Sequence, residues 1–96
     1  MINMAHINAE IPEKARPYFQ KYDRLRVEFS YQRQGTDFVG SVKILLLSDE
    51  PDVPMAAVAT LDRTSKTEPE FVEEAGRIAQ NEQLLNTLLL YEAFGL

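Results

Sequence analysis

The chain has 96 residues, of which 45% are hydrophobic and 26% are charged, and its formal net charge is −5. This length and composition predict a single folded domain over residues 1–96. The sequence contains no cysteine, which excludes disulfides, thiolate metal sites and a cysteine nucleophile. Its start lacks a charged segment followed by an apolar one, so we expect a cytoplasmic protein. A virus-encoded protein that acts inside a host cell would look the same.

Charge is distributed unevenly along the chain. Residues 1–43 carry seven basic and five acidic side chains, a net charge of +2, whereas residues 44–96 carry three basic and ten acidic side chains, a net charge of −7. This asymmetry predicts a basic surface and an acidic surface that can make different contacts.

The N-terminal quarter gives weak signals. Residues 1–8 alternate only faintly, which is compatible with a short edge strand or a frayed tail. Residues 9–23 have a helical composition that Pro12 and Pro17 interrupt. Because a proline inside a helix removes a hydrogen bond, this segment predicts a turn or short helix near residues 12–16 and a fresh start at Pro17.

Residues 24–62 predict the sheet. The clearest strand spans residues 24–34, where apolar and polar side chains alternate, and its inward face is Leu25, Val27, Phe29 and Tyr31. Gly35 is expected at positive φ in the turn that follows. The second strand, residues 38–48, closes a hairpin with the first and is apolar on both sides in its second half.

Two features complete the predicted sheet. Gly40, inside the second strand, is expected to mark a bulge or a bend. A short third strand over residues 55–61 is rich in alanine, which would let a helix lie close to the sheet. Residues 62–66 are then expected to form a polar loop.

Residues 67–94 predict one long helix. Thr67 and Glu70 have the spacing of a capping box, in which each side chain accepts a hydrogen bond from a backbone N–H of the first turn. Pro69 lies in that turn, where its missing N–H costs nothing, and Gly95 provides a stop. No proline interrupts the stretch between them.

The predicted helix has two apolar faces. A period of 3.6 residues places one set on the side expected to face the sheet: Phe71, Val72, Ala75, Ile78, Ala79, Leu85, Leu89 and Ala93. In its second half the opposite side is also apolar, with Leu84, Leu88, Leu90, Tyr91 and Phe94. This second stripe needs a cover, either the N-terminal segment folded back over it or the surface of another subunit or partner. The apolar run falls far short of the roughly 18 residues that a membrane span requires, so no membrane partner is expected.

The fold class predicted from these elements is α+β. A three-stranded antiparallel meander is packed by one long C-terminal helix, with a short N-terminal helical segment.

No pattern of residues predicts catalysis, a metal site or a cofactor. His6 is the only histidine; a general base needs an orienting partner and a pocket, and His6 lies in residues 1–8, for which a frayed tail is one expectation. Asp49, Glu50 and Asp52 provide oxygen ligands, but their spacing matches no calcium loop. Residues 63–66 precede a helix N-terminus, yet they contain no glycine to admit an anion and acids follow them.

Two functions follow from the remaining features. The preferred prediction is a small non-catalytic binding, adaptor or inhibitor-type protein, acting through protein–protein contacts and self-association on the second helix stripe. The alternative is a single-stranded nucleic-acid binding protein. In that alternative Arg24, Arg26 and Lys43 contact phosphates from the polar face of the sheet, and aromatic side chains stack on bases, namely Tyr18, Phe19, Tyr22 and Tyr31.

Overall fold

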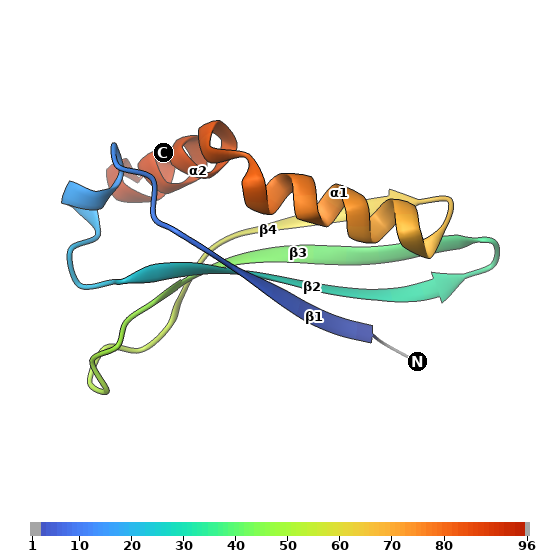
Figure 1. Cartoon of the computed structure of the whole chain (residues 1–96), viewed down its shortest axis with the longest axis horizontal. Coiled ribbons are helices and arrows are strands. Elements are labelled where there is room, and N and C mark those ends of the chain that lie inside the picture. Colours follow the sequence, from blue (N-terminus) through green and yellow to red (C-terminus); the bar gives the residue numbers. More distant parts are fainter. Residues whose placement is uncertain (1–2, 96) are drawn as a thin grey trace.

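The computed structural model describes residues 3–95. Four strands form one antiparallel sheet in the order β1-β2-β3-β4, and the two helices lie on one of its faces (Figure 1). The elements in chain order are β1 (Asn3–Ala9), the 3₁₀ helix η1 (Arg16–Tyr18), β2 (Arg24–Gln34), β3 (Asp37–Leu47), β4 (Ala56–Ser65), α1 (Glu68–Gln80) and α2 (Glu82–Phe94). The α+β class and the antiparallel meander are therefore as predicted.

The expectation of three strands is wrong, because residues 3–9 form a fourth. β1 pairs with β2 along its whole length, from Asn3 opposite Tyr31 to Ala9 opposite Leu25. Every residue of β1 except Ala9 is exposed, so the strand shows almost no contrast between an inner and an outer face. Sequence periodicity detects burial on one face, and β1 is joined to the sheet mainly through its backbone.

The expectation of one long helix is also wrong, because Asn81 separates α1 from α2. Asn81 has φ −86° and ψ 85°, which is not helical, and its backbone N–H donates to the Ile78 carbonyl at 3.2 Å. Its side-chain oxygen accepts from the backbone N–H of Leu84 at 3.1 Å, so the same residue closes α1 and caps α2. The break lets α2 take a different direction over the sheet (Figure 1).

The core lies between the helices and β2 and β3, in two parts. Under α1 it contains Val27, Phe29, Val42, Phe71, Ala75, Ile78 and Ala79. Under α2 it contains Ile11, Ala15, Phe19, Leu25, Ile44, Leu46, Leu85 and Leu89. The predicted inward face of β2 is confirmed for Leu25, Val27 and Phe29, which are at most 5% exposed.

The predicted sheet face of the helices is correct at six of its eight positions. Val72 is 37% exposed and Ala93 is exposed, whereas the other six side chains are buried. Ala93 follows Leu85 and Leu89 at four-residue spacing on the same face of α2, but it lies in the last turn of the helix and is not part of the core.

Glycine at position 40 is explained by packing rather than by a bulge. A Cβ at Gly40 would lie 2.7 Å from Cζ of Phe71, so the absence of a side chain lets the Phe71 ring of α1 rest on the sheet. The register shift in this strand falls between Ile44 and Leu45 instead. Gly35 has φ 64° in the two-residue turn between β2 and β3, as predicted.

β4 is longer than expected and replaces most of the predicted loop. Residues 62–65 continue the strand, and two of them face α1. Arg63 Nε lies 3.6 Å from Glu74 Oε1, and the Ser65 hydroxyl donates to Glu74 Oε2 at 3.5 Å. Because these residues contact the helix through polar atoms, the sequence shows no alternation of apolar and polar residues that would have predicted the strand here.

The cap of α1 differs from the predicted capping box by one residue. Thr67 Oγ1 accepts from the Glu70 backbone N–H at 3.3 Å, as expected. The Glu70 carboxylate accepts from the backbone N–H of Lys66 at 3.2 Å, and not from that of Thr67. The helix therefore begins where the sequence indicated.

A candidate protein-binding surface at the end of α2

The second apolar stripe of α2 is divided between the core and the surface. Leu84 and Leu88 are half-buried and pack against the cores under α1 and α2 respectively. Leu90 is also half-buried. Tyr91 and Phe94 remain 53% and 57% exposed. Only the C-terminal part of the predicted interface is thus open to a partner.

The N-terminal segment accounts for much of the cover on α2. Ile11, Ala15 and Phe19 are buried in the core under α2, and Leu88 of the second stripe packs against this core. The segment holds this position with a turn in which the Ala15 N–H donates to the Pro12 carbonyl at 2.9 Å, followed by η1. Folding back of the N-terminal segment was one of the two covers expected from the sequence, and it leaves the last turn of α2 incompletely covered.

Three aromatic side chains gather where this segment meets the end of α2. The Tyr18 ring of η1 lies edge-to-face against the Phe94 ring, with centroids 5.1 Å apart and an interplanar angle of 69°. Tyr91 precedes Phe94 by three residues and therefore neighbours it on the helix surface. We call Tyr18, Tyr91 and Phe94 the aromatic surface; each is more than half exposed.

Tyr18 could not have been assigned to this surface from the sequence. The sequence suggested only that it could stack on a base, and no local pattern links it to a residue 76 positions later. The contact depends on how segment 10–23 folds back over α2, which is a tertiary feature. Phe94 and Tyr91, in contrast, were both predicted as interface residues from the helix period.

The three candidate nucleic-acid contacts share a sheet face but each has an acidic neighbour. Arg24, Arg26 and Lys43 lie on the side away from the helices, as their register positions require. Arg24 forms an ion pair with Asp49, and Arg26 lies 3.7 Å from Glu28. Glu28 is also directly opposite Lys43 in the register. Two carboxylates therefore offset most of the charge of the three basic side chains on this face.

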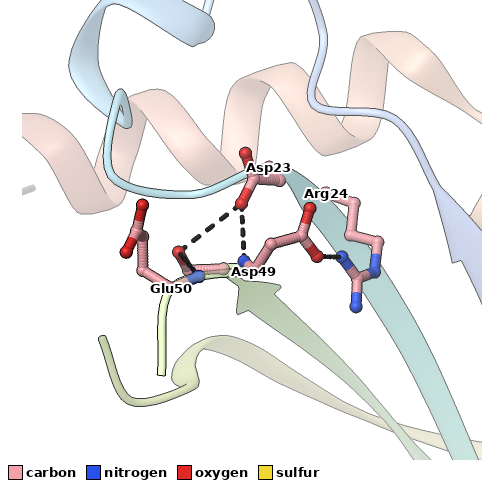
Figure 2. Close-up of polar contacts among 5 residues, drawn as sticks. Asp23, Arg24, Asp49 and Glu50 are labelled. Atoms are coloured by element: carbon pink, nitrogen blue, oxygen red, sulfur yellow. Dashed lines mark hydrogen bonds and ion pairs between the residues drawn. The ribbon is translucent and has the colours of Figure 1, made fainter. Parts of the chain in front are cut away.

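The acidic turn after β3 is held in place by hydrogen bonds within the protein, and its carboxylates show no obvious arrangement for binding a metal ion. Figure 2 shows the Asp23 carboxylate at the start of β2, where it accepts from the Asp49 backbone N–H at 2.6 Å and from the Ser48 hydroxyl at 3.5 Å. The Glu50 N–H donates to the Ser48 hydroxyl at 3.1 Å. These bonds join the β3–β4 connection to the start of β2. Within residues 3–95 no three His, Asp or Glu side chains come close enough to hold a metal ion.

The N-terminus of α1 is occupied by the protein's own side chains. Thr67 and Glu70 accept from backbone N–H groups at this end. The adjoining hollow is lined by Glu70, Glu73 and Glu74 together with Lys66 and Arg77. Three carboxylates beside these N–H groups disfavour an anion there.

One titratable group near α1 has a shifted pKa. The Tyr31 hydroxyl donates to Glu68 Oε1 at 3.0 Å. This hydrogen bond raises the pKa of Tyr31 above its ordinary 10.0, and burial and the Glu68 charge act in the same direction. The hydrogen bond between Tyr31 and Glu68 joins β2 to the first turn of α1, and this structural contact explains the raised pKa of Tyr31.

Neither helix in the described part of the chain is long and apolar enough to cross a membrane. Comparisons with known protein families, with curated proteins and with solved structures find no match to this chain.

Proposed function

We propose that this protein is a non-catalytic binding protein that self-associates through the aromatic surface. The observation that supports the proposal is the exposure of Tyr18, Tyr91 and Phe94 next to one another. Large aromatic side chains lose favourable burial when they stay in water, and monomeric proteins seldom leave a contiguous apolar patch without a use for it.

A second copy of the chain is the occupant that the charges around this surface favour. Residues 14–21 carry three basic side chains and no acidic one, namely Lys14, Arg16 and Lys21. α2 carries two acidic side chains and no basic one, Glu82 and Glu92. Glu92 is adjacent to Tyr91, so one copy presents both signs beside its aromatic surface. A two-fold axis can place the basic segment of one copy against the acidic helix of the other.

The position of the surface is compatible with such a contact. η1 and the last turn of α2 lie at the end of the molecule away from the β2–β3 turn (Figure 1). Two copies can meet there without disturbing either sheet. Three aromatic side chains that are half exposed supply roughly 300 Å² per copy, which is well below a standard interface and predicts a weak, concentration-dependent dimer.

Light scattering on a size-exclusion column tests the proposal with matched variants. Phe94→Ser removes an aromatic ring from the surface, whereas Met55→Ser removes an apolar side chain of similar exposure, 56%, from the β3–β4 loop. We expect Phe94→Ser to shift the protein toward monomer and Met55→Ser to behave like the wild type. Equal masses for both variants and the wild type would contradict the proposal.

A further inference from the structure

The free edge of β1 is unusually open to another strand. β1 pairs with β2 on one side, and no strand in the described part of the chain pairs with its other side. The seven residues of β1 contain no Lys, Arg, Asp, Glu, Pro or Gly, and their pairing with β2 has no register shift. Edge strands are normally protected against added strands by such charges, prolines and bulges.

The opposite edge of the sheet has the protection that β1 lacks. β4 carries Asp62 and Arg63, and the register between β3 and β4 shifts at Ile44 and Leu45. A shift of this kind twists a strand and interrupts a regular hydrogen-bonding edge. The two edges of one sheet therefore differ, and β1 is the one suited to accept a strand.

A cavity of about 630 Å³ adjoins the C-terminal half of β1. Its other walls come from the segment after β1 and from the two helices, so it lies between the end of β1 and the junction of α1 and α2. Its walls include the apolar side chains of Ile7, Ile11 and Leu85. Its remaining lining carries three carboxylates, Glu10, Glu13 and Glu82, and one guanidinium, that of Arg16.

Two basic side chains lie near the carboxylates of this cavity without forming an ion pair: Arg16 lines the cavity itself, and Lys14 lines an adjoining hollow with Glu13 and Glu82. Among residues 3–95 no ion pair involves Glu10, Glu13 or Glu82. Arg16 directs its Nε to the carbonyl oxygen of Ile11 at 3.1 Å. The cavity thus combines apolar walls with unpaired negative charge, which suits a Lys or Arg side chain with its apolar stem inside and its charged head at the carboxylates.

We propose that β1 accepts an extended segment of a partner protein as a fifth strand, and that a Lys or Arg of this segment enters the cavity beside β1. Backbone hydrogen bonds to the free edge supply affinity, and the side-chain site supplies specificity. The chain's own β1 contains neither Lys nor Arg, so a second copy paired through β1 would leave the carboxylates unmatched. The cavity shares Arg16 and Glu82 with the charged surroundings of the aromatic surface but contains none of its three aromatic residues, so Phe94→Ser lets either proposal fail alone.

Synthetic strand peptides test this proposal by fluorescence anisotropy. The probe is a seven-residue peptide of alternating Thr and Val, matching the length of β1, with Lys at its central position. The control peptide has Glu at that position. We expect the Lys peptide to bind at least about tenfold more tightly, corresponding to 1.4 kcal/mol.

Backbone methylation separates strand addition from simple charge attraction. Only alternate N–H groups of an added strand face its neighbour. N-methylation of one alternate set should abolish binding of the Lys peptide, whereas methylation of the other set should leave it nearly unchanged. An equal effect of both sets would overturn the proposal.

Charge reversal on the protein identifies the cavity. Glu13→Lys should weaken the Lys peptide and strengthen the Glu peptide, and Glu82→Lys provides a second variant, with folding checked by circular dichroism. The binding assays are repeated on Phe94→Ser, so that self-association through the aromatic surface cannot affect the result. Failure of both peptides to bind at millimolar concentration would overturn the proposal, and so would a dimer that forms through β1.

Discussion

Replacing Gly40 with alanine tests the packing of α1 on the sheet. The new methyl group would overlap the carbonyl oxygen of Ser30, and it would lie 2.7 Å from Cζ of Phe71 and 2.8 Å from Cα of Tyr31. Favourable carbon–carbon contacts require about 3.5–4.0 Å. The Phe71 ring can rotate away, but two of the three contacts are with the backbone of β2. They can be relieved only if β2 and β3 move apart.

The expected cost follows from these contacts. Overpacking a well-filled site typically destabilises a protein by about 1–3 kcal/mol, and by more where the backbone must move. Replacing glycine with alanine also restricts the unfolded chain, which returns about 0.4–1 kcal/mol. We therefore expect Gly40→Ala to lower the free energy of unfolding by about 2 kcal/mol or more.

Gly76 in α1 provides the matched control. An added Cβ at Gly76 meets no atom within 4 Å, and alanine is favoured over glycine inside a helix by about 0.5–1 kcal/mol. Urea denaturation followed by circular dichroism should show Gly76→Ala to be more stable than the wild type and Gly40→Ala to be less stable. A Gly40→Ala variant as stable as the wild type would refute the described approach of Phe71 to the sheet.

Three further changes test the helix termini and the contact between β2 and α1. Asn81→Ala should cost about 1 kcal/mol of stability in urea denaturation, because the cap on the Leu84 N–H is lost; no change would argue for one continuous helix. Thr67→Ala should cost a similar amount through the cap of α1, and an unchanged melting temperature would mean that α1 begins elsewhere. The raised pKa of Tyr31 means that its hydrogen bond to Glu68 stabilises the fold fully below about pH 10 and less as the pH rises through the folded-state pKa. Tyr31→Phe should therefore make stability fall less between about pH 9 and pH 11, and an identical slope in both proteins would contradict this assignment.

The parts of the fold that the sequence predicted are those in which one face of an element is buried. β2 alternates so regularly that its expected residues, 24–34, match the structure. The buried face of α1 was predicted for the same reason. β1 gave no such signal because nearly all of it is exposed, and the continuation of β4 was hidden because Arg63 and Ser65 contact Glu74 through polar atoms.

The break at Asn81 was missed because apolar periodicity continues on both sides of it. A cap residue followed by an acid, Asn81 and Glu82, was the available signal, since both are favoured at helix N-termini. The contact between Tyr18 and Phe94 had no comparable signal, because it depends on the path of the N-terminal segment. Sequence reasoning therefore found the helix side of the candidate surface and missed the side supplied by η1.

Sedimentation equilibrium of the wild-type protein tests self-association most directly. A dimer formed through Tyr18, Tyr91 and Phe94 predicts an average mass that rises from 11.0 kDa toward twice that value as concentration increases from micromolar to millimolar. The rise should be absent from Phe94→Ser. A wild-type mass that stays at 11.0 kDa over this whole range would contradict the account.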